Sequence, residues 1–241
     1  MNMTFKQWLT YDFPKDEIIF DASGYGLLKI LGMSEQYGDP PVTHPVGIAR
    51  QGKNYILNNN IKQDSINTHK NLCYSSFTSY HDNEKKTRQT CLTNITNLSF
   101  VTIDKSLVPF EDYATNLIQH KFCISPEGTG EDCHRHYEAI FFKCIPIINN
   151  PSNDYCLKKW GLPSRVKQKY DQLPVLYTDD YRELTESYLN SKYEEILNTT
   201  YNFNKLTKTF WKYNSFLLSI QCQRYQDVQN CLPEFYLNDD A

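Results

Sequence analysis

The stretch from His120 to Asn150 carries features that suit the binding of an anion. An apolar segment, FCIS, is followed by a loop with Gly128 and Gly130 and then by CHRHYEAIFFK, whose apolar residues recur at helical spacing. The glycines let the backbone approach a ligand closely. The start of the helix offers unpaired N–H groups and the positive end of the helix dipole. The pattern therefore indicates an anion site where the loop meets the helix.

Arg135 lies in the first turn of that predicted helix. A cation there opposes the helix dipole at a cost of ~0.3–1 kcal/mol. The position becomes favourable if an anion is shared between the helix start and the planar arginine fork, and a pyrophosphate would satisfy both. The alternative is a surface ion pair with Glu131 or Asp132. The local sequence alone supports the two interpretations equally.

Three further residues could serve the same ligand. Glu138 follows Arg135 by three residues on the same helix face, so it could accept hydrogen bonds from ribose hydroxyls or form an ion pair worth ~0.2–0.5 kcal/mol. Glu127 could contact the ligand from the loop or cap the turn. Arg88, in an earlier predicted helix, could reach the phosphate site or be solvated.

Other kinds of site are not indicated. Cys133, His134 and His136 point in different directions around a helix, and no second Cys/His pair stands nearby at zinc-finger spacing, so we expect no metal site. The sequence has no phosphatase-type Cys-x5-Arg, Walker lysine loop or Gly-x-Ser-x-Gly motif. Nucleotide binding without a Walker motif remains, and no cofactor is predicted besides the nucleotide itself.

Short apolar segments alternate with longer helical patterns from about residue 70. The predicted order is strand 72–78, helix 84–95 capped by Asp82 or Asn83, strand 98–104, helix 109–121, strand 122–125, helix 133–143, strand 144–148, strand 173–178, helix 181–198 capped by Asp179 or Asp180, and helix 204–223. This alternation is typical of βαβ units with a parallel sheet. The predicted fold class is α/β, with a Rossmann-type parallel-sheet domain.

Polar loops follow three of these strands. They are SFTSYHDNEKKTR, SPEGTGEDCHR and TDDYRE. Because ligands bind outside the carboxyl ends of parallel strands, these loops should meet at one edge of the sheet. Thr78 and Ser125 therefore join Gly128, Glu127 and the arginines in the predicted binding site.

The chain divides into three parts by composition. Residues 1–68 are rich in Gly and Pro turns and are too short for a second Rossmann-type unit, so we interpret them as a reduced N-terminal lobe. Residues 69–223 form the predicted nucleotide-binding domain, and 224–241 a C-terminal tail.

Bulk composition limits the function further. A formal net charge of −3 argues against partners such as nucleic acid or an anionic membrane. No window approaches the ~18 apolar residues that span a bilayer, and no export signal is seen, so the expected location is cytoplasmic. The eight cysteines are expected to be reduced thiols.

The stretch from Ser125 to Ile147 resembles the nucleotide-binding lobe of exostosin-type glycosyltransferases. That lobe carries a Pro-x-Gly-like turn, an R-x-x-E-A helix and a C-[IV]-P-[VI] strand. The corresponding segments here are SPEG (125–128), RHYEA (135–139) and CIPI (144–147). LPVLYTDDYREL resembles a later family segment, with Tyr181 where tryptophan is usual, and the final helix carries Tyr201, Leu206 and Trp211 in family-like order. Fucosyltransferases use a more distantly similar lobe.

The resemblance implies a GT-B-like enzyme that transfers a sugar from a UDP- or GDP-linked donor to a glycan or other hydroxyl acceptor. Transfer would be inverting and independent of metal. Arg135 and Arg88 would neutralise the departing pyrophosphate, and Glu138 would hold the ribose.

Inverting transfer also needs a general base, which in this family comes from the N-terminal lobe. Asp21 and His44 are the candidates, with Asp179 as a third, although each could be a cap or turn residue. Two rival functions remain open. One is a binding module that has lost catalysis, and the other is a signalling α/β domain with Asp104 as phosphoacceptor.

Overall fold

A computed structural model describes residues 1–19, 45, 47–59, 69–79, 86–104, 106–128, 132–150, 166–211 and 213. Five strands form a parallel sheet, as predicted from the alternating pattern: β2 (Asn71–Ser75), β3 (Val101–Ile103), β4 (His120–Ile124), β5 (Ile145–Asn149) and β6 (Leu176–Thr178). Their spatial order is β3-β2-β4-β5-β6. The α/β class and the parallel sheet are therefore confirmed, whereas the GT-B architecture stays a prediction.

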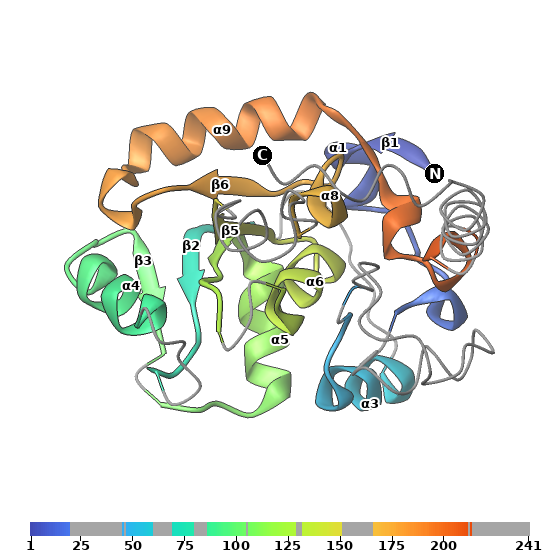
Figure 1. Ribbon diagram of the computed structural model, residues 1–241, viewed down its shortest axis with the longest axis horizontal. Coiled ribbons are helices and arrows are strands. Elements are labelled where there is room, and N and C mark those ends of the chain that lie inside the picture. Colours follow the sequence, from blue (N-terminus) through green and yellow to red (C-terminus); the bar gives the residue numbers. More distant parts are fainter. Residues whose placement is uncertain are drawn as a thin grey trace, which may run out of the picture.

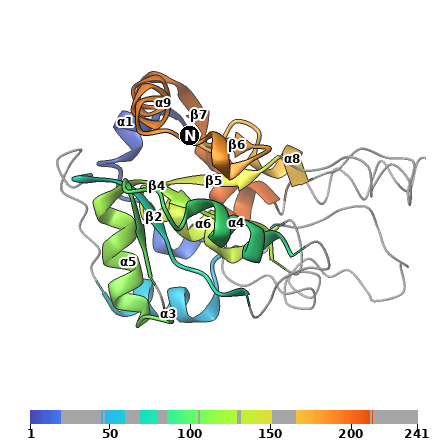
Figure 2. The ribbon, with the colours of Figure 1, turned by 90° about the vertical axis from the view of Figure 1, so that its left-hand side faces the viewer.

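Helices cover both faces of this sheet (Figures 1 and 2). Figure 2 shows α1 (Phe5–Trp8) and α9 (Glu186–Asn198) on one side, with α3 (Arg50–Asn58) and α5 (Phe110–Gln119) on the other. The remaining α-helices of the described ranges are α4 (Thr87–Ile95), α6 (His134–Phe141) and α8 (Val166–Tyr170). Because both faces are covered, strands such as β5 are buried along nearly their whole length, which explains their continuous apolar sequence.

The helices predicted over 181–198 and 84–95 differ from the observed ones. The segment predicted as one helix over 181–198 is split into a 3₁₀ turn, η4 (Tyr181–Glu183), and α9, because Thr185 starts a new helix by accepting a hydrogen bond from the Tyr188 backbone N–H. Asp180 caps only the short turn. The predicted helix 84–95 begins later, at Thr87, because Lys86 has a left-handed backbone (φ 52°). Its predicted caps, Asp82 and Asn83, lie outside the described residues.

The two ends of the described chain meet beside the sheet. Strand β1 (Asn2–Thr4) pairs antiparallel with β7 (Thr200–Asn202). The 3₁₀ turns η1 (Lys15–Glu17) and η5 (Phe203–Leu206) follow β1 and β7, and residues 208–211 are helical, so the predicted helix over 204–223 starts later. The buried side chains of residues 1–19 and 47–59 belong to the same apolar cluster as those of the sheet.

Lys143, which follows the C-terminal end of α6, is a buried cation with 6% of its surface exposed. Its ammonium donates to the Tyr11 carbonyl at 2.9 Å and lies 3.5 Å from the centre of the Trp8 ring. Burial lowers its pKa from 10.5 to about 7, and Asp12 opposes that change only in part. In the folded protein Lys143 therefore loses its proton at a lower pH than in the unfolded chain.

We expect the free energy of unfolding to rise with pH between about 7 and about 10.5, because the unfolded chain binds more protons in that window. Lys143→Met should remove this contribution. Denaturant unfolding of both proteins at pH 7.5 and 9.5 checks the expectation. An equal pH dependence in the two proteins would contradict it.

Candidate functional site

The order of the strands places a switch point between β2 and β4. From β2 the chain crosses to β3 on one side, and from β4 it proceeds to β5 and β6 on the other. The carboxyl ends of the two central strands are neighbours, since Ser75 pairs with Ile124. Ligands of open α/β sheets bind in the crevice at such a point. Two of the three predicted loops, those after β2 and β4, leave from here.

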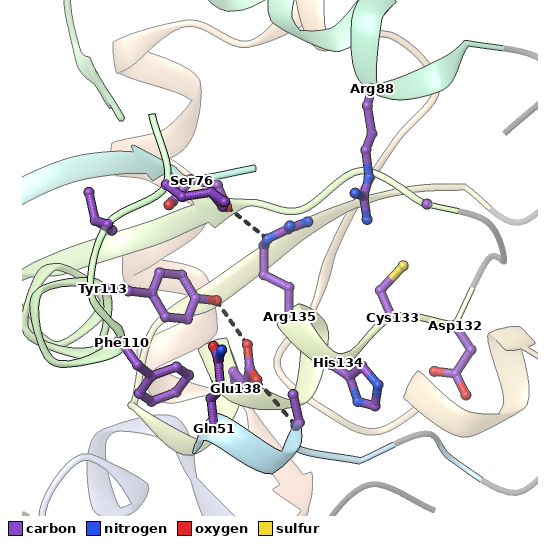
Figure 3. A pocket seen from close by; sticks show the side chains of 14 residues that line it. Gln51, Ser76, Arg88, Phe110, Tyr113, Asp132, Cys133, His134, Arg135 and Glu138 are labelled. Atoms are coloured by element: carbon purple, nitrogen blue, oxygen red, sulfur yellow. Dashed lines mark hydrogen bonds between the residues drawn. The ribbon is translucent and has the colours of Figure 1, made fainter. Parts of the chain in front are cut away.

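A cavity of about 490 Å³ opens at this position. Figure 3 shows side chains from α4, α5, α6 and the start of α3 turned toward it. Its walls combine two arginines, a glutamate and several apolar or aromatic groups: Ala49, Gln51, Ser76, Arg88, Leu107, Val108, Phe110, Tyr113, Gly128, Asp132, Cys133, His134, Arg135 and Glu138. Four of the residues predicted from sequence, namely Arg88, Gly128, Arg135 and Glu138, line the same cavity.

Arg135 enters the cavity from the first turn of α6. Its Nε donates to the Ser76 carbonyl at 3.1 Å, and its guanidinium carbon lies 5.2 Å from the centre of the Phe77 ring. Its Nη1 is buried and donates to no atom of the described residues. An unused buried donor on a cation is costly, so the guanidinium would gain from an added acceptor. Of the two alternative ion-pair partners, Asp132 pairs with Lys169, and Glu131 lies outside the described residues.

Arg88 reaches the cavity from α4 and connects the two loops. Its Nη1 donates to the Thr78 carbonyl and its Nε to the Glu127 carbonyl, each at 3.3 Å. Figure 3 shows its guanidinium turned toward the same space as that of Arg135. Two cations that share one cavity repel each other, so their arrangement favours a ligand with more than one negative charge.

Gly128 is required by the position of Arg88. A Cβ atom at residue 128 would lie 2.3 Å from Nη2 of Arg88. Gly128→Ala should therefore displace the guanidinium and weaken the binding of a diphosphate, while the fold is retained. Titration of the variant with inorganic pyrophosphate checks this, with Glu194→Ala, at an exposed position of α9, as the control. Unchanged affinity in Gly128→Ala would contradict it.

Glu138 lies one turn after Arg135 and is only 6% exposed. Its Oε1 accepts from the Ala49 backbone N–H and its Oε2 from the Tyr113 hydroxyl, both at 3.2 Å. Burial raises the pKa of its carboxyl, while the charge of Arg135 and the bond from Ala49 oppose that rise. Glu138 thus joins three elements, α6, α5 and the segment before α3.

The other predicted binding residues support the cavity without lining it. Thr78 contributes its carbonyl to Arg88. Glu127 accepts from the Thr87 hydroxyl at 3.0 Å, and its own N–H donates to Asn149 at 3.4 Å. Ser125 is fully buried behind the loop, and its carbonyl faces Nε2 of His136 at 3.0 Å. A contact between these three residues and the nucleotide sugar stays a prediction.

The two histidines of α6 have separate partners. Nδ1 of His134 lies 2.8 Å from the Gly47 carbonyl, whereas His136 is buried between Ser125 and Tyr170. Burial lowers the pKa of His136 to about 4. Among the described residues, no three His, Cys, Asp or Glu side chains come close enough to hold a metal ion.

The described part of the structure places none of the candidate general bases at the cavity. Asp21 and His44 lie outside the described residues. Asp179 is exposed after β6 and does not line the cavity. Sequence reasoning in turn missed the wall formed by Ala49, Gln51, Phe110 and Tyr113. The start of α5 after a strand end could have indicated Phe110 and Tyr113, but no motif marked residues 49–51.

Comparison with known protein families gives the family of the chain. The model of the family described as RXYLT1 C-terminal domain matches residues 57–231, which is more than half of the chain. The chain belongs to the RXYLT1 C-terminal domain family. This is a xylosyltransferase-related, exostosin-like family of glycosyltransferase type, so the resemblance predicted from the sequence is confirmed at that level. No curated protein matches the chain.

The matched region contains Arg88, Gly128, Arg135 and Glu138 but not Ala49 or Gln51. One wall of the cavity is therefore supplied by chain outside the family match. Within the described ranges, no helix has the length and apolar character to cross a membrane. The cytoplasmic location stays a prediction.

Proposed function

We propose that the protein is a glycosyltransferase that takes a sugar from a nucleotide-diphosphate donor, with the diphosphate bound between Arg88 and Arg135. One observation carries the proposal: Arg135, which has a buried guanidinium donor that bonds to no described residue, lines a cavity at the switch point beside a second arginine. Family membership supplies the reaction class. A nucleoside monophosphate offers less charge for two cations than a diphosphate does.

The proposed reaction is a direct displacement. The oxygen of an acceptor hydroxyl, on a glycan or another alcohol, forms a bond to the anomeric carbon. The bond from that carbon to the diphosphate breaks, and its electron pair leaves on the diphosphate oxygen. The two guanidinium groups stabilise this charge as it develops, the role that a metal ion has in other enzymes. The hydroxyl proton passes to a general base, for which Asp21 and His44 remain the candidates. The configuration at the anomeric carbon is inverted.

A thermal-shift screen with UDP-, GDP- and CMP-sugars tests the proposal. A donor present at about 100 times its Kd should stabilise the protein by about 2.7 kcal/mol, which raises Tm by roughly 5–10 °C for a chain of this size. Donor turnover, followed as release of the nucleoside diphosphate, separates a transferase from a binding module that has lost catalysis. No shift with any nucleotide sugar would overturn the proposal.

A further inference from the structure

Residues 47–52 are docked onto the helices that carry the site. The Ala49 N–H donates to Glu138, and the Gly47 carbonyl lies 2.8 Å from Nδ1 of His134. Gly52 allows α3 to approach α5 closely, because a Cβ atom there would lie 2.9 Å from the Phe110 ring. Through these contacts Ala49 and Gln51 become one wall of the cavity.

Glu138 is the charged residue at the centre of this arrangement. Each of its carboxylate oxygens already accepts a hydrogen bond from the protein, and 94% of its surface is covered, since 6% is exposed. The two oxygens are directed toward a backbone donor and a side-chain donor on two other elements.

We propose that Glu138 is a positioning residue. It ties the segment before α3 to α6 and α5, and so completes the cavity beside Arg135. The effect of this wall on donor binding rests on the proposed function, because the wall matters to the protein only if the cavity binds the donor. The tie itself, between Glu138 and Ala49, can be measured without any ligand.

Two substitutions break the same tie from opposite sides. Glu138→Ala removes the acceptor. Ala49→Pro removes only the N–H donor, and it suits the backbone, since Ala49 has φ −62° and Ile48 before it forms a β-bridge. Glu138→Gln keeps an oxygen that can accept from Ala49 and should restore the tie. Glu194→Ala, an exposed carboxylate on α9, is the matched control.

Hydrogen exchange of residues 47–58 and titration with inorganic pyrophosphate and with UDP and GDP are measured for all five proteins. In Glu138→Ala and Ala49→Pro we expect exchange at least about tenfold faster in this segment and roughly tenfold weaker binding of pyrophosphate as well as of the nucleotide. Glu138→Gln should stay within about threefold of the wild type, as should the control.

The inference is overturned if Ala49→Pro exchanges and binds like the wild type. It is overturned as well if Glu138→Ala weakens UDP or GDP but not pyrophosphate, the result expected of a residue that acts only on the ribose. It is also overturned if Glu138→Gln is as impaired as Glu138→Ala. Failure of the proposed function is distinct: the wild-type protein would then bind none of the three probes, while the exchange of residues 47–58 would still test the tie.

Discussion

Replacing Arg135 with alanine should weaken the binding of a nucleoside diphosphate by about 10- to 150-fold, because a hydrogen bond to a charged group contributes about 1.5–3 kcal/mol. The Nε of Arg135 is already used by Ser76, so the loss concerns the other donors of a guanidinium that lines the cavity. Arg135→Lys should restore charge but not the planar fork, and its affinity should fall between the two.

Isothermal titration at one fixed salt concentration measures this effect. Arg182→Ala is the matched control, because that arginine is 74% exposed on its side chain and pairs only locally with Asp180. Removal of Arg135 also takes a stabilising charge from the Glu138 carboxylate, so Tm is recorded for each variant. An Arg135→Ala protein that stays folded and binds like the wild type would show that the diphosphate is not bound here.

Trp8→Ala should lower the free energy of unfolding by about 3–5 kcal/mol. The indole is fully buried and stacked on Phe203 with ring centres 4.1 Å apart. Its N–H donates to the Ile140 carbonyl of α6, the helix that carries Arg135, at 3.1 Å. The side chain therefore joins the first helix to the site helix and to the segment after β7.

Denaturant unfolding followed by two probes measures this loss. Trp8→Phe keeps an aromatic ring but removes the N–H donor, so a smaller loss of about 1–2 kcal/mol is expected. We expect one cooperative transition in each protein, since residues 1–19 share the apolar cluster of the sheet. A near-wild-type stability of Trp8→Ala, or a separate early transition, would indicate that the N-terminal segment folds apart from the sheet.

The sequence predicted the sheet because its strands are buried on both faces and therefore stand out as apolar segments, as CIPII does. It also predicted that the strand-end loops would converge, because parallel strands end at one edge, and the family resemblance implied that Arg88 and Arg135 would serve one ligand. The break before α9 was missed, although Thr185 carries its own signal as an N-cap residue.

The wall at Ala49 could not be predicted in the same way. It depends on a hydrogen bond between residues 89 positions apart, and neither the alanine nor the glycine-rich sequence around it marks a partner. The order of the strands likewise depends on which helices cover which face. Periodicity identifies a strand, but it does not state the strand's neighbours.

The most direct test of the account is a titration of two proteins, the wild type and an Arg88→Ala/Arg135→Ala double variant. The ligand is the nucleoside diphosphate of whichever nucleotide sugar stabilises the protein in the donor screen. We predict that the wild type binds it and that the folded double variant shows no measurable binding. Equal affinity in the two proteins would contradict a diphosphate site between these arginines.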